Sequence, residues 1–151
     1  MTVAGQVAVE GLGYARPMDD KTDHIARLPL FAGLGARSIE AIAALARTGS
    51  QPAGAVLVRE GEPGDTFYVI ATGTVRILRN GVFVRSLSDG GFLGEISLVE
   101  GGETTATATC ATDCELVSFG GFEFGRLLAT FPDVRARVDA AIARRPHDHE
   151  A

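Results

Sequence analysis

The stretch VRILRNGVFVRSL at residues 75–87 decides the fold prediction for this chain. Asn80 and Gly81 separate two short runs of apolar and β-branched residues. An Asn-Gly pair adopts the positive φ angles of a two-residue turn, so it predicts a tight antiparallel hairpin. The hairpin joins a strand that begins at Val75 to a strand at residues 82–87. The surrounding chain is therefore predicted to consist of short strands and tight turns.

Similar short runs, separated by turn residues, occur on both sides of this hairpin. Strands are expected at residues 56–58, 67–71, 104–110 and 115–119. The 19 glycines among 151 residues suit many tight corners, because glycine adopts positive φ without steric cost. Strands spaced every 8–12 residues or so indicate a sandwich or roll. We predict an antiparallel β-roll with jelly-roll topology over residues 50–120.

Helical periodicity flanks the predicted roll on both sides. Within residues 24–47, apolar residues recur at helical spacing, and Ser38 is predicted to cap an amphipathic helix. Within residues 121–145 a helix pair is predicted, with the second helix starting at Pro132. The fold class is therefore mainly β, with N-terminal helices and a C-terminal helix pair.

The length of the chain fits one domain with short extensions. We assign residues 1–23 to a flexible N-terminal leader, residues 24–145 to the folded domain and residues 146–151 to a tail. Apolar residues make up 46% of the sequence, which is enough for a core.

The charge balance excludes one class of partner. Nineteen acidic and fourteen basic residues give a net charge of −5, and no basic face is concentrated enough to bind nucleic acid. No signal-type N-terminus and no apolar run of about 18 residues occur, so we expect a cytoplasmic protein without membrane contact. Cys110 and Cys114 are then expected to be reduced thiols and, without further nearby ligands, small apolar residues beside a turn.

Catalytic constellations are absent from the sequence. The three histidines are His24, His147 and His149, and none has an evident serine, cysteine or carboxylate partner. A solvated tail is favoured over a metal site at the two terminal histidines. No phosphate-binding lysine loop occurs either, so we expect no enzyme activity, no metal and no cofactor.

The most unusual segment is GGFLGEISL at residues 90–98. A strand reaches Phe92, glycine follows, and a helical turn is expected to begin near Glu95. The first backbone N–H groups of such a turn have no intrahelical acceptor and can bind an anion. Gly94 lets a ligand approach the backbone, and Glu95 can accept hydrogen bonds from a vicinal diol. A capped turn without a ligand fits the segment equally well.

Motifs elsewhere in the chain favour the binding interpretation. In order along the chain they are LFAGL at 30–34, PAGAVLVREGEPGD at 52–65, FYVI at 67–70, GTV at 73–75 and ATDCEL at 111–116. Residues 24–145 resemble the cyclic-nucleotide-binding domain family, of the catabolite-activator and kinase-regulatory-subunit type. The phosphate-binding cassette of that family corresponds to residues 94–105.

The resemblance implies a role for each residue at the start of the cassette. Gly94 admits the sugar, and Glu95 binds the ribose 2′-hydroxyl. The amides of Ile96 and Ser97 face the cyclic phosphate. The implied ligand is cAMP or cGMP, or another small anion.

The end of the cassette departs from the family pattern. The resemblance implies an arginine at position 104, but Thr104 stands there, followed by a fitting Thr105. A charge-assisted hydrogen bond contributes about 1.5–3 kcal/mol, so we expect affinity lower by about ten- to several-hundred-fold. Arg85 could compensate, but the sequence does not give its direction. Val75 and Val84 occupy positions that line the purine pocket by resemblance.

Three functions remain open at this point. The chain ends six residues after Arg145, so we expect a stand-alone regulatory module, monomeric or weakly dimeric. It would bind a cyclic nucleotide weakly, bind a less charged ligand in a retuned pocket, or act as a degenerate scaffold that contacts a protein partner.

Overall fold

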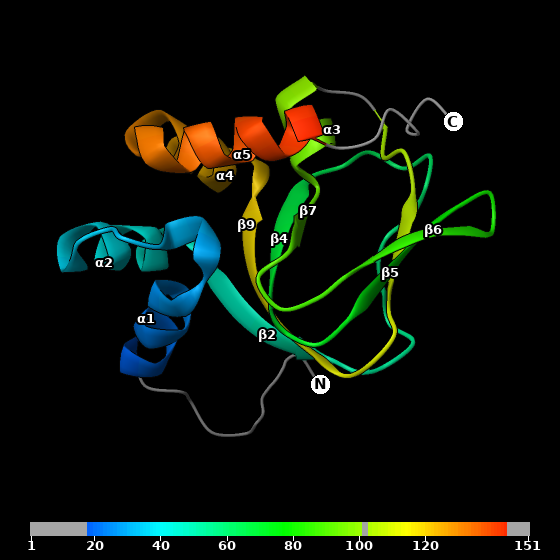
Figure 1. The fold of residues 1–151 in the computed structure, drawn as a ribbon, viewed down its shortest axis with the longest axis horizontal. Helices are drawn as coiled ribbons and strands as arrows, with labels where there is room; N and C mark the ends of the chain where they lie inside the picture. The colour runs from blue at the N-terminus through cyan, green and yellow to red at the C-terminus, as the bar shows by residue number, and fades with distance from the viewer. Residues whose placement is uncertain (1–17, 101–102, 145–151) are drawn as a thin grey trace.

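Two antiparallel four-stranded sheets form a β-roll with flanking helices, which confirms the predicted fold class (Figure 1). The computed structural model describes residues 18–100 and 103–144. The first sheet has the order β2 (Arg47–Gln51), β9 (Cys114–Gly120), β4 (Thr66–Thr72) and β7 (Phe92–Leu93). The second has the order β3 (Val56–Val58), β8 (Thr107–Cys110), β5 (Val75–Arg79) and β6 (Val82–Leu87).

The helices gather on the side of the first sheet that faces away from the second sheet (Figure 1). They are α1 (Met18–Arg27), η1 (Pro29–Phe31), α2 (Ala36–Leu45), α4 (Gly121–Thr130) and α5 (Pro132–Arg144). A short helix, α3 (Glu95–Glu100), follows β7 directly. The C-terminal helix pair and its restart at Pro132 are as predicted. None of the described helices is long and apolar enough to cross a membrane.

The hairpin between β5 and β6 has the predicted turn. Asn80 has a φ of 53° and Gly81 a φ of 79°, and Arg79 pairs with Val82 across the turn. Positive φ at both central residues matches the right-handed twist of the two strands. A register shift follows Ile77, so the residues of β5 before and after this point pair with β6 in different registers.

The N-terminal helices differ from the prediction in two respects. Residues 18–23 were assigned to a flexible leader, but they form the first part of α1. Ser38 does not cap α2, because the helix begins two residues earlier, with extended Gly35 at the N-cap position. The Ile39 amide donates to the Gly35 carbonyl at 3.0 Å, which places Ser38 inside the first turn. The rest of the predicted leader and the predicted tail, residues 146–151, lie outside the described residues.

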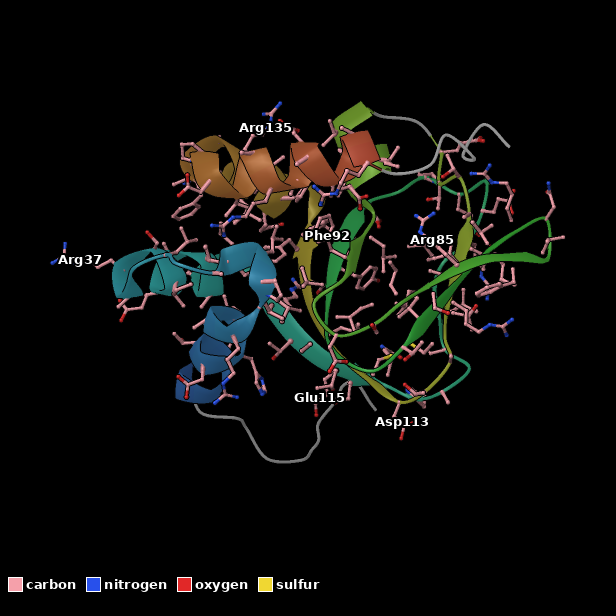
Figure 2. The ribbon with its side chains drawn as sticks, in the orientation of Figure 1. Arg37, Arg85, Phe92, Asp113, Glu115 and Arg135 are labelled. Carbon is pink, nitrogen blue, oxygen red and sulfur yellow. The ribbon has the colours of Figure 1, made fainter. Side chains whose placement is uncertain are left out.

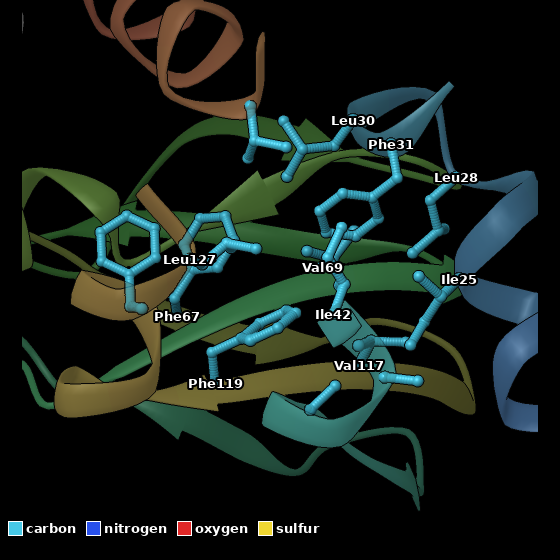
Figure 3. Packing of buried hydrophobic residues seen from close by; sticks show 14 of the residues in the cluster. Ile25, Leu28, Leu30, Phe31, Ile42, Phe67, Val69, Val117, Phe119 and Leu127 are labelled. Carbon is cyan, nitrogen blue, oxygen red and sulfur yellow. The ribbon is translucent and has the colours of Figure 1, made fainter. Parts of the chain in front are cut away.

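Two hydrophobic clusters lie on opposite faces of the first sheet. The larger cluster joins the helices to that sheet, and Figure 3 shows its aromatic rings and aliphatic side chains. The Phe67 ring lies 4.5 Å from the Phe124 ring and 6.0 Å from the Phe119 ring, measured between centroids. The smaller cluster fills part of the space between the two sheets. The Arg137 guanidinium donates to the Leu30 carbonyl at 2.9 Å and ties α5 to η1.

Candidate functional site

A cavity between the two sheets brings together most of the residues predicted to bind the ligand. It holds about 540 Å³ of empty space, part of it open to solvent. Its lining residues are Val58, Gly64, Thr66, Ile77, Arg85, Leu93, Gly94, Glu95, Ile96, Thr104, Thr105, Ala106 and Ala108. The two halves of the predicted cassette, residues 94–96 and 104–105, therefore meet at one cavity.

Gly94 opens one wall of the cavity, immediately after β7. Its φ of 95° is a conformation that residues with a Cβ rarely adopt. A Cβ built on Gly94 would collide with the carbonyl oxygen of Thr66 in β4. The glycine is thus required by close packing against β4, in addition to any role in admitting a ligand.

Glu95 begins α3 and is 1% exposed. Among the residues whose burial the structure describes, it is the one polar or charged residue that is fully buried. Moving a carboxylate out of water costs several kcal/mol unless charges or hydrogen bonds offset the loss. Glu95 thus presents a carboxylate with both oxygens buried beside the cavity.

The threonine pair that lines the cavity, Thr104 and Thr105, is held through its backbone. The Thr104 amide donates to the Glu62 carbonyl at 2.8 Å, and the Gly61 amide donates to the Thr104 carbonyl at 2.9 Å. The Arg79 Nε donates to the carbonyl of Thr105 at 3.2 Å. These bonds hold the loop before β8 against the turn after β3, so both threonines have fixed backbone positions at the cavity.

The second sheet supplies an apolar wall that ends in a charge. Val58, Ala108 and Ile77 lie in register on β3, β8 and β5. Arg85 continues this row, because it pairs with Ile77 on the edge strand β6. Figure 2 shows the Arg85 side chain in the space between the two sheets. The sequence did not give the direction of the Arg85 side chain. In the structure this side chain faces the cavity.

Two predicted purine-pocket residues do not line the cavity. Val75 is fully buried in the smaller cluster, at a position paired with Cys110. Val84 packs against the same cluster, while the adjacent Arg85 takes the cavity-facing place on β6. Side chains alternate between the faces of a strand, so a shift of one residue on β6 brings Arg85 rather than Val84 to the cavity. Val75 and Ile77 share one face of β5, and Ile77 is the one of the two that lines the cavity. Ile77 and Arg85 stand where Val75 and Val84 were predicted.

Ser97 lies in the first turn of α3, and its predicted amide contact stays a prediction. The sequence reasoning missed Leu93 and Thr66, which line the cavity from the first sheet. Leu93 directly precedes the Gly94-Glu95 pair, and that adjacency is the signal that could have found it.

The two cysteines are buried free thiols in the smaller cluster, where they act as small apolar residues. The Cys114 Sγ donates to the Thr74 and Thr112 carbonyls at 3.5 and 3.4 Å. Burial, and then the neighbouring Cys114, raise the pKa of the Cys110 thiol to about 12. Residues 18–100 and 103–144 contain no group of three or more side chains suited to a metal. His147 and His149 lie outside the described residues.

Comparison with known families places this cavity in context. The family model described as the cyclic nucleotide-binding domain matches residues 50–131, more than half of the chain. The chain belongs to the cyclic nucleotide-binding domain family. Every residue that lines the cavity falls within the span that matches this domain.

Known members of the family cover much of this chain. A cyclic nucleotide-gated potassium channel of Rhizobium etli is 34% identical over 122 residues, which are 80% of this chain and 34% of the channel. The catabolite activator protein of Thermus thermophilus matches with a TM-score of 0.70 and 28% identity over 81% of this chain and 60% of that one.

The regulatory domain of Toxoplasma gondii PKA, in a co-crystal with cAMP, shares the fold with a TM-score of 0.74 and 21% identity. That match covers 85% of this chain and 50% of the Toxoplasma chain. This chain spans about a third or less of the curated relatives first matched, so those relatives contain further regions.

Proposed function

We propose that this domain binds a purine cyclic nucleotide, cAMP or cGMP, in the cavity between the two sheets. The observation that carries the proposal is Glu95, a buried carboxylate that lines the same cavity as Thr104 and Thr105. The regulatory domain of Toxoplasma gondii PKA, which shares this fold, is known in a co-crystal with cAMP. The domain acts as a regulatory module, cytoplasmic and monomeric or weakly dimeric. Its proposed bounds stay residues 24–145, with the start moved to Met18 because α1 begins there.

The chemistry of the cavity matches the parts of such a ligand. The apolar row of Val58, Ala108 and Ile77 suits a purine ring. Glu95 accepts hydrogen bonds from a ribose hydroxyl, and the hydroxyl of Thr105 donates to a phosphate oxygen. The amides in the first turn of α3, including those of Ile96 and Ser97, supply further donors.

We expect the affinity to be limited at Thr104, an uncharged residue at the position where the family pattern has an arginine. Thr104→Arg should raise the affinity for cAMP or cGMP at least tenfold, because a guanidinium forms charge-assisted hydrogen bonds to phosphate. Isothermal titration calorimetry at up to millimolar nucleotide measures this change. Raising the salt concentration should reduce the gain if the phosphate is partly exposed.

Thr130→Arg is the matched control, since it adds the same charge at an exposed residue of α4. It should leave the affinity unchanged. Glu95→Ala combined with Thr104→Arg should lose most of the gain, because the ribose loses its acceptor. If neither the wild type nor Thr104→Arg binds at millimolar nucleotide, the proposal is wrong and the scaffold function becomes the better account.

A further inference from the structure

The described part of the cavity lining contains one cationic side chain, Arg85. Thr104 and Thr105 carry no charge, and Glu95 carries a negative one when ionised. An anionic ligand placed beside Glu95 needs a compensating positive charge, because like charges repel strongly away from water. Among the described lining residues, only Arg85 on β6 can supply that positive charge.

The placement of Arg85 in its strand is unusual for an arginine. It pairs with Ile77, whose side chain is 7% exposed and belongs to the smaller cluster. Arg85 therefore occupies an inward-facing position, where an apolar residue would fill the roll at lower cost. The half-buried guanidinium reaches the cavity from the second sheet, whereas Glu95 follows the first sheet.

Neighbouring arginines of the second sheet have other contacts. The Arg76 guanidinium lies 5.3 Å from the centroid of the exposed Phe83 ring. Arg79 donates through Nε to the carbonyl of Thr105, and so holds the loop rather than lining the cavity. The three arginines therefore lie at three different places, and of them Arg85 is the one that lines the cavity.

We infer that Arg85 binds the anionic group of the ligand, so that β6 supplies the charge that the loop at Thr104 lacks. This inference rests on the proposed function and specifies how the same site selects its ligand. The consequence is a preference for a charged cyclic nucleotide over the corresponding neutral nucleoside. The alternative is that Arg85 only balances the buried charge of Glu95 and touches no ligand.

Titration calorimetry with cAMP and adenosine, and with cGMP and guanosine, tests this inference. The wild type should prefer the nucleotide over its nucleoside at least tenfold. Arg85→Gln should lose most of that preference by weakening nucleotide binding while nucleoside binding changes little. Arg85→Lys should keep part of it, because an ammonium retains the charge without the two-pronged geometry.

The variant that carries both Arg85→Gln and Thr104→Arg moves the charge from β6 to the loop, and it should restore the preference. Arg76→Gln is the matched control, since it removes a charge from β5 at the exposed Phe83, and it should change nothing. Thermal unfolding of each variant checks the fold. If Arg85→Gln does not fold, Arg85→Lys and the salt dependence of nucleotide binding by the wild type decide the question.

Each contrary result has a distinct meaning. If the wild type binds and Arg85→Gln keeps the preference for the nucleotide, Arg85 does not hold the anion. If Arg85→Gln weakens nucleotide and nucleoside equally, Arg85 contacts the base or ribose and the inference is wrong. If only Thr104→Arg binds nucleotide, Arg85 supplies no useful charge, although the proposed site stands. If no variant binds, the proposed function itself fails.

Discussion

The two faces of the first sheet use the same strands for different purposes. On the helix-covered face, β4 and β9 contribute Phe67, Val69, Val117 and Phe119. On the face toward the roll, they contribute Tyr68, Ile70, Cys114 and Leu116. The first set packs under helices into an apolar cluster with four contacting aromatic pairs across the fold. The second set packs beside a cavity whose lining includes a buried carboxylate and an arginine.

This difference indicates that stability and binding are separated across one sheet. The helix-covered face gains hydrophobic free energy from large side chains that bury no charge. The roll-facing side packs against smaller residues of the second sheet, among them Ala108 and Cys110, beside the cavity. Changes on the helix-covered face should therefore alter the free energy of unfolding most, and changes beside the cavity should alter affinity most.

The largest expected effect is at Phe67, which is 0% exposed on the helix-covered face. Phe67→Ala should lower the free energy of unfolding by about 3–5 kcal/mol, because the lost ring leaves a cavity among three aromatic neighbours. Phe122→Ala is the control, since that ring is 71% exposed, and it should change stability by about 0.5 kcal/mol or less. Urea unfolding measures both. Similar losses for the two variants would contradict the comparison.

Much of the fold could be predicted because its signals are local. Asn80 and Gly81 are adjacent, and their conformational preferences alone determine the hairpin. The start of α1 could not be predicted in this way. Residues 18–23 are mostly polar, and the helix they begin is held by tertiary contacts such as that of Ile25, which is 0% exposed in the larger cluster.

The site could be predicted only as far as the family motifs reach. Gly94 and Glu95 are adjacent in sequence, but Thr104 reaches their cavity because its backbone is bonded to the turn after β3. Which residues of β6 face the cavity could not be predicted. The family resemblance pointed to Val84, and it carries no information on the register of β6 in this chain. The register with Ile77 places the arginine there instead.

The smaller cluster, between the two sheets, should be the more sensitive to alkaline conditions. Burial raises the pKa of the Cys110 thiol from 9.0 to about 12 in the folded state. Burial, and then the charge of Asp65, raise the pKa of Tyr68, which its hydrogen bond with Thr66 partly offsets. In the unfolded chain each group ionises at a lower pH, so the unfolded state holds fewer protons above about pH 9. Stability should be fully present below pH 9 and decline as the pH rises toward 12.

Urea unfolding between pH 8 and about 11 measures this decline, to which one group contributes at most about 1.4 kcal/mol per pH unit. Cys110→Ala should have a shallower slope against pH, and Tyr68→Phe should remove a smaller share at the alkaline end. Phe67→Ala is the matched control from the opposite face, and it should lower stability without changing the slope. An unchanged slope in Cys110→Ala would show that the thiol does not limit alkaline stability.

The smallest effect should come from Gly125, an exposed residue inside α4 on the helical side of the molecule. A Cβ built there meets nothing within 4 Å. Gly125→Ala should therefore raise the free energy of unfolding by about 0.5–1 kcal/mol, because alanine loses less backbone entropy in a helix. Gly54→Ala is the matched control, since its Cβ is equally unobstructed but its φ of 92° strains an alanine, so stability should fall. Urea unfolding measures the rise in the free energy of unfolding for Gly125→Ala and the fall for Gly54→Ala. Calorimetry should show unchanged nucleotide affinity in Gly125→Ala. A gain in stability accompanied by a loss of affinity would mean that the helical layer and the cavity are coupled, and that the two faces of the sheet are not independent.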